Sequence, residues 1–146
     1  MKGKIAVTMT TLALIAFLAG CAGVPKVVVP EVQKPATYEL GGLYLTTDEK
    51  QMSGVAHDSA KLGVGETVVV YARGMSSVET GGKWFELPAE ITVNWKADRE
   101  LEVTPAVGHV VTVKVVKPIS VSSYVTVTAT TKDGKKIEAV FTVMPK

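Results

Sequence analysis

Apolar and polar residues alternate along several short segments from residue 43 onward, a pattern typical of β-strands with one buried face. The clearest segment spans residues 91–96, where Ile91, Val93 and Trp95 are predicted to face inward and the residues between them outward. Segments with this pattern are predicted as strands: residues 43–47, 67–73, 91–96, 110–116, 124–130 and 137–143. After the first 20 residues, the chain shows no sustained helical apolar period, so helices are not expected there.

Turn residues separate these segments. The best turn signal is Asp133-Gly134 before the last strand, because Asp-Gly suits the positive φ of a type I′ hairpin. Valine and threonine are frequent, and β-branched side chains favour strands over helices. We therefore predict an all-β domain over residues 37–146, built as a two-sheet antiparallel β-sandwich.

The N-terminus has a different pattern. Residues 1–4 form a short basic leader, and residues 5–19 are apolar apart from their threonines. This apolar run is shorter than the ~20 residues that span a bilayer, and it fits the central region of a secretory signal peptide. It ends in the sequence LAGC at residues 18–21, which resembles the lipobox of bacterial lipoprotein precursors.

The lipobox resemblance implies cleavage after Gly20, so that residues 1–20 are the signal peptide and the sulfur of Cys21 carries diacylglycerol. The new amino group is often acylated as well in that family, and two or three acyl chains anchor a protein stably to a membrane. By resemblance to enteric lipoproteins, Ala22 favours the outer membrane. A host with a single membrane would carry the protein on the outer face of its cytoplasmic membrane. Two alternatives remain: an ordinary signal peptide with an incidental cysteine, or an uncleaved anchor.

A tether is predicted between the lipid and the domain, over residues 21–36. Pro25, Pro30 and Pro35 each remove a backbone donor and fix φ, so neither a helix nor a central strand can run through this segment. In an extended conformation of ~3.1 Å per residue, the fifteen residues 22–36 would hold the domain up to about 45 Å from the lipid.

The order of short motifs in the predicted domain identifies a family resemblance more specifically than any single motif does. The motifs are Val64-Gly65-Glu66 before a strand, Trp95 within residues 91–98, residues 125–129, and the closing strand at residues 139–143. This order resembles a bacterial Ig-like domain of group 2 over residues 61–143. The resemblance implies an Ig-like sandwich with Trp95 packed between its sheets. Residues 75–88 look like an insertion, residues 119–123 depart from the family pattern, and residues 37–60 match it poorly.

The net charge and the cysteine content limit the kinds of partner and of internal cross-link that can be expected. The chain has 16 basic and 14 acidic residues, and removal of Lys2 and Lys4 with the signal peptide leaves 14 of each. A near-neutral chain gives no electrostatic reason to expect nucleic acid as a partner. The single cysteine permits neither an internal disulfide nor a thiolate metal cluster.

The chain contains histidine, serine and acidic residues, but their spacing does not fit a catalytic or metal site. His57-Asp58-Ser59 contains the residue types of a catalytic triad, but adjacent residues cannot converge on one point, so a solvated turn is expected. His109 has no second histidine at ligand spacing. The alternating acidic residues 98–102 are expected to form a solvated edge. We therefore expect no catalytic residues, no metal site and no cofactor.

Trp84 and Phe85 are the candidate partner-binding residues. They lie between Gly82 and Pro88 within residues 75–88, and adjacent residues of an extended segment point in opposite directions. Exposed aromatic side chains on loops are frequent anchors of recognition. The alternative is that both rings cover the open end of the sandwich.

The expected function is that of a non-enzymatic envelope lipoprotein, anchored to a membrane through acyl chains on Cys21. Domains of this family are frequent in surface proteins and adhesins, so the resemblance implies contacts with a protein or glycan, as in an accessory subunit of a surface or secretion assembly. The alternative is a structural scaffold of the cell envelope that has no specific ligand.

Overall fold

The computed structural model describes residues 39–146. The predicted signal peptide, the lipidated Cys21 and nearly all of the residues before the first strand lie outside this part of the chain. The strands are β1 (Leu40–Thr46), β2 (Ser59–Leu62), β3 (Thr67–Ser76), β4 (Trp84–Glu86), β5 (Thr92–Ala97), β6 (Leu101–Thr104), β7 (Val110–Val115), β8 (Ser123–Thr130) and β9 (Lys136–Pro145). A short 3-10 helix, η1 (Val78–Thr80), lies between β3 and β4.

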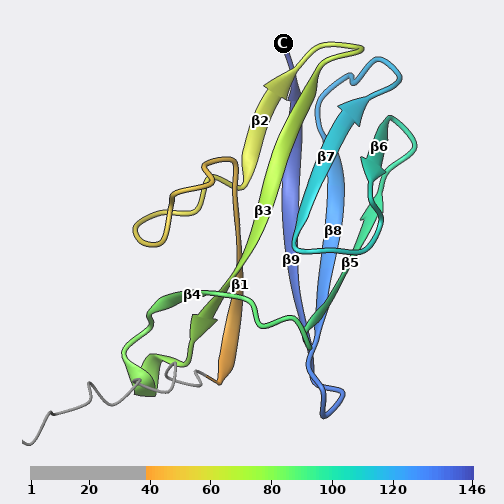
Figure 1. The fold of residues 1–146 in the computed structure, drawn as a ribbon. Helices are drawn as coiled ribbons and strands as arrows, with labels where there is room; N and C mark the ends of the chain where they lie inside the picture. The colour runs from red at the N-terminus through yellow and green to blue at the C-terminus, as the bar shows by residue number, and fades with distance from the viewer. Residues whose placement is uncertain (1–38) are drawn as a thin grey trace, which may run out of the picture. The chain divides into compact units, whose positions relative to one another are not determined.

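The strands form two sheets (Figure 1). The first has the order β1-β3-β7-β6, and β4 joins it by pairing with the second half of β3. The second has the order β2-β9-β8-β5. All of these pairs are antiparallel except β2 and β9, which run parallel. The prediction of an all-β domain with two largely antiparallel sheets is confirmed, and the parallel pair is an addition to it.

Both sheets contribute to one hydrophobic core. The buried residues that alternate along the predicted strands are Val70, Ala72, Ile91, Val93, Trp95, Val111, Val113, Val115, Val125, Val127, Ala129, Phe141 and Val143. Trp95 is 5% exposed, and its indole N–H donates a hydrogen bond of 2.8 Å to the carbonyl oxygen of Gly108. This bond satisfies the ring's polar group inside the core. The prediction that Trp95 faces inward is confirmed.

Several elements differ from the sequence-based expectation. β2, β4 and β6 were not predicted, because strands of three or four residues are too short to display a period of two. Residues 37–60, which match the family poorly, contribute β1 and the first half of β2 to the two sheets. Residues 75–88 are not simply an inserted loop, because they contain the end of β3, η1 and β4.

The hairpin between β8 and β9 is present, but its predicted turn type is wrong. Gly134 has a φ of 87°, whereas no residue other than glycine in the described range has a positive φ. A type I′ turn needs a positive φ at both central residues. Instead, the amide of Gly134 donates to the carbonyl of Thr131 at 2.9 Å, and the amide of Thr131 donates to the carbonyl of Lys135 at 2.9 Å. The connection is therefore a three-residue loop whose glycine supplies the left-handed position.

Glu66 of the Val-Gly-Glu motif closes the turn between β2 and β3. Its carboxylate accepts a 2.8 Å hydrogen bond from the amide of Gly63 and a 2.7 Å bond from the ammonium of Lys146. The bonds from Gly63 and Lys146 hold the pKa of Glu66 below its usual value. Glu66 thus ties the start of β3 to the end of the chain beside β9.

Truncation of the buried tryptophan tests the core. Trp95→Ala is expected to lower the free energy of unfolding by roughly 3–5 kcal/mol, because it removes a large buried ring and leaves a cavity. Lys96→Ala, on the exposed face of the same strand, is the matched control and should stay within about 0.5 kcal/mol of the wild type. Chemical denaturation followed by circular dichroism measures both. Equal stability of the two variants would contradict burial of Trp95.

Candidate binding surface

The second half of β3 lies between β1 on one edge and β4 on the other (Figure 1). Arg73 is the register partner of Tyr44 on β1 and of Glu86 on β4, and Met75 is the register partner of Trp84. Register partners share one face of a sheet. Because the residues that alternate with them on β3 face the core, these side chains lie on the outer face.

We define the outer-face cluster as Tyr44, Tyr71, Arg73, Met75 and Trp84. The rings of Tyr44 and Trp84 are in contact, with centroids 4.7 Å apart and planes tilted by 38°. Tilted aromatic pairs attract one another beyond the effect of buried area alone. The four members other than Arg73 are half-buried, so each still presents part of its side chain to solvent.

Arg73 is the buried member of the cluster, with 7% of its surface exposed. Its guanidinium carbon lies 5.3 Å from the centre of the Tyr71 ring, within the range of a cation–π interaction. The Nη2 group donates a 2.8 Å hydrogen bond to the carbonyl oxygen of Glu49. The buried Nε group has no hydrogen-bond acceptor within the described part of the chain.

The loop that follows β1 holds the Glu49 carbonyl in place. Thr46 is fully buried, and its hydroxyl donates to the side-chain oxygen of Gln51. The side-chain Nε2 of Gln51 donates to the carbonyl oxygens of Ser53, at 3.2 Å, and Val55, at 2.6 Å. The loop is therefore internally bonded where it meets Arg73.

Trp84 and Phe85 point to opposite sides of β4, as adjacent residues of an extended segment should. Phe85 packs against the core, where its ring lies over Gly74. A Cβ atom built on Gly74 would come within 2.6 Å of two carbons of that ring. Of the two candidate partner-binding residues, Trp84 lies on the outer face, and Phe85 joins β4 to the core.

Both histidines lie beside strands. His57 is exposed, Ser59 begins β2, and the carbonyl of Asp58 accepts the amide of Thr142 at 2.8 Å, so this tripeptide borders a strand. The ring Nε2 of His109 is hydrogen-bonded to the carbonyl of Ile91 at 2.7 Å. Within residues 39–146, no three His, Cys, Asp or Glu residues are grouped so that they could hold a metal ion.

Asp98 and Glu102 are exposed, as expected for a solvated edge, and Asp98 and Glu100 also accept hydrogen bonds from the start of β8. Asp98 accepts the amide of Tyr124 at 2.8 Å. Glu100 accepts a 2.7 Å bond from Arg99 and a 3.1 Å bond from the hydroxyl of Ser123. The bond from Arg99 is the main cause that lowers the pKa of Glu100 below its usual value. These carboxylates join the β5–β6 turn to the start of β8.

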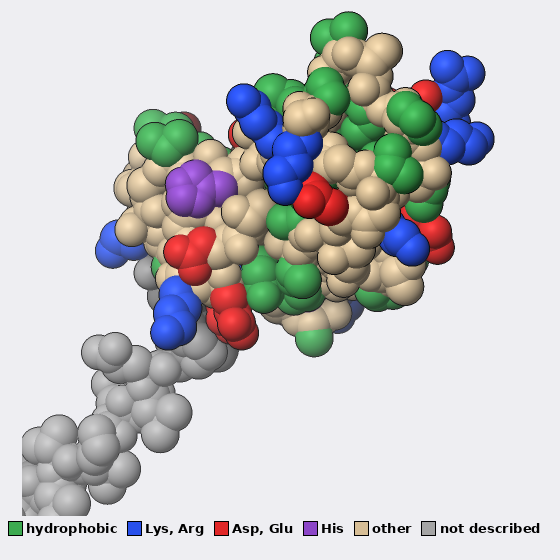
Figure 2. Space-filling model, turned by 90° about the horizontal axis from the view of Figure 1, so that it is seen from above, with side chains coloured by type: hydrophobic (Ala, Val, Ile, Leu, Met, Phe, Trp, Pro, Cys, Tyr) green, Lys and Arg blue, Asp and Glu red, His purple; other side chains and the backbone are tan. Residues whose placement is uncertain are grey.

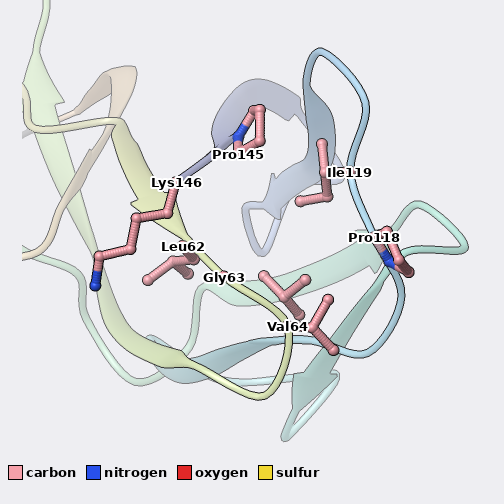
Figure 3. A pocket seen from close by; sticks show the side chains of 8 residues that line it. Leu62, Gly63, Val64, Pro118, Ile119, Pro145 and Lys146 are labelled. Carbon is pink, nitrogen blue, oxygen red and sulfur yellow. The ribbon is translucent and has the colours of Figure 1, made fainter.

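A cleft of about 200 Å³ opens where the β2–β3 turn approaches the β7–β8 loop (Figure 3). Its apolar lining consists of Leu62, Val64, Val115, Pro118, Ile119 and Pro145. Lys146 borders the cleft, but its ammonium pairs with Glu66 at 2.7 Å. Apart from Lys146, the lining residues include no acid, base or nucleophile, so the cleft is mainly an apolar surface.

Charges of both signs are interspersed on the end of the domain seen in Figure 2, where hydrophobic side chains lie among them. Neither sign forms a continuous patch on this face. In the described range, no helix is long and apolar enough to cross a membrane. Comparison of the chain with protein-family models, with curated proteins and with solved structures finds no match.

The contact between Gly74 and Phe85 can be tested by adding one methyl group. Gly74→Ala is expected to lower the free energy of unfolding by roughly 1–3 kcal/mol, because the new methyl must displace the Phe85 ring or the β4 backbone. Gly63→Ala is the control, since its added methyl would meet nothing closer than 3.7 Å. Thermal unfolding of both variants measures the difference. If Gly74→Ala is as stable as the control, the ring does not lie over Gly74.

Proposed function

We propose that this protein is a bacterial cell-envelope lipoprotein, anchored to a membrane through acyl chains on Cys21. In this proposal, its Ig-like domain binds an envelope protein or glycan and catalyses no reaction. The lipid anchor brings the domain to the envelope, and the outer-face cluster supplies the contact.

The strand order supports an Ig-like sandwich. In an Ig domain one sheet carries strands A, B, E and D, and the other carries C, F and G. The orders β1-β3-β7-β6 and β2-β9-β8-β5 correspond to A-B-E-D and to a short first-strand segment followed by G-F-C. Trp95 then occupies the strand C position, where Ig domains carry a buried tryptophan.

The N-terminal sequence supports the anchor. Cys21 is the chain's single cysteine and ends the lipobox-like sequence at residues 18–21. The proline-containing residues 22–36 follow it, and the first strand of the domain begins at Leu40. This order suits a lipid-anchored domain on a tether.

The observation that carries the binding role is the contact between Tyr44 and Trp84 on the outer face of the first sheet. Both rings are half-buried, so they are held by the fold and still reach solvent. Aromatic side chains that are rigid and partly exposed supply contact area at a low cost in conformational entropy.

Replacement of the cysteine tests the anchor. Cys21→Ser should move the protein from the membrane fraction to the soluble fraction and abolish labelling by radioactive fatty acid, because the acyl chains supply the membrane affinity. Trp84→Ser, which leaves Cys21 intact, should stay in the membrane fraction. A wild-type protein that incorporates no label would overturn the lipoprotein assignment.

A photo-crosslinking side chain at position 84 tests the contact surface in living cells. We expect specific crosslinked products from position 84 and few from position 124. Tyr124 is a matched control, since it is 45% exposed on the outer face of the other sheet. Equal crosslinking from both positions would remove the reason to assign the contact to the outer-face cluster and would favour a scaffold role.

A further inference from the structure

The outer-face cluster contains a cation, Arg73, for which residues 39–146 supply no counter-ion. Arg73 is 7% exposed, and the ion pairs formed within residues 39–146 do not include it. Glu86 is its register partner on β4, yet that side chain is exposed and forms no ion pair with Arg73. A buried charge is costly unless an opposite charge or a full set of hydrogen bonds compensates it. The carbonyl of Glu49 compensates one nitrogen, while Nε has no acceptor in the described chain.

The side chains around Arg73 are those that concentrate binding energy in protein interfaces. Tryptophan, tyrosine and arginine are enriched at interface hot spots, and methionine is enriched in interfaces generally. Tyr44, Tyr71, Met75 and Trp84 lie on the same sheet face as Arg73, and the ring of Tyr71 is 5.3 Å from its guanidinium carbon. The apolar surface continues past Tyr71, because its register partner Val110 is 43% exposed.

The composition of this surface favours a protein over a glycan. A sugar presents many hydroxyl groups, each of which needs a donor or acceptor when it is covered. The outer-face cluster offers two phenolic hydroxyls, one indole N–H and one guanidinium within a largely apolar surface. A polypeptide can present apolar side chains and one carboxylate together, which matches this arrangement.

We infer that the outer-face cluster docks a protein segment in which an aspartate or glutamate lies next to apolar side chains. The carboxylate faces Arg73 and supplies the negative charge that residues 39–146 do not. The apolar side chains cover Tyr44 and Trp84 and extend toward Val110. The inference deepens the proposed contact role and rests on it, but it does not depend on lipidation of Cys21.

Selection from a library of random peptides tests this chemistry. The full chain, purified in detergent, is the bait, and the affinity of selected peptides is measured by fluorescence polarisation. We expect the selected peptides to combine an acidic residue with aromatic or aliphatic neighbours. Trp84→Ser and Arg73→Gln should each weaken binding by at least about tenfold, and Arg73→Lys should restore part of the loss.

Two further measurements separate recognition of charge from loss of fold. Conversion of the peptide's acidic residue to its amide should weaken binding at least about tenfold without any change to the protein. Glu86→Gln is the matched control on the protein, since it removes a negative charge beside Arg73 and should preserve or tighten binding.

The inference is overturned if the selected peptides lack acidic residues, or if their binding survives both Arg73→Gln and Trp84→Ser in folded protein. Binding of acidic glycans in place of peptides would also overturn it. If position 84 still crosslinks a partner in cells while no acidic peptide binds, the proposed contact role stands and this inference fails.

Discussion

The pairing of β3 along both of its edges is the constraint on which the first sheet depends. β1 occupies one edge, and β7 and then β4 share the other. Side chains alternate along a strand with a period of two, so a slip of one residue would exchange the buried and the outer sets. Burial of Val70 and Ala72 therefore fixes Tyr71 and Arg73 on the outer face.

Packing inside the domain also positions the surface outside it. The Phe85 ring lies over Gly74 on the inner side of the β3–β4 pair. The same pairing sets Trp84 beside Tyr44 on the outer side. Arg73 makes this arrangement locally unfavourable in free energy, because its guanidinium is buried and only partly hydrogen-bonded. Proteins tend to accept such costs at functional sites.

Alternation predicted the strands that are long enough and have one fully buried face. β5 and β8 lie within about one residue of their expected positions, and Trp95 is buried as expected. Sequence reasoning also predicted that Trp84 and Phe85 would diverge, since this needs only an extended backbone. The sequence alone could not show which of the two rings faces outward, because that depends on the β3–β4 register. The burial of Arg73 depends on the loop after β1. Arg73 and Glu49 are far apart in the sequence, so no local sequence pattern predicts their hydrogen bond.

Nuclear Overhauser effects from the Trp84 indole test most directly whether the β3–β4 pairing places this ring on the outer face. The chain has two tryptophans, so the Trp84 resonances can be identified by comparison with a Trp95→Phe variant. The structure predicts cross-peaks between Trp84 and the ring of Tyr44, whose centroid lies 4.7 Å away, and between Phe85 and core methyl groups. Cross-peaks from Trp84 to core methyl groups such as those of Val70 and Val111, without any to Tyr44, would contradict the account.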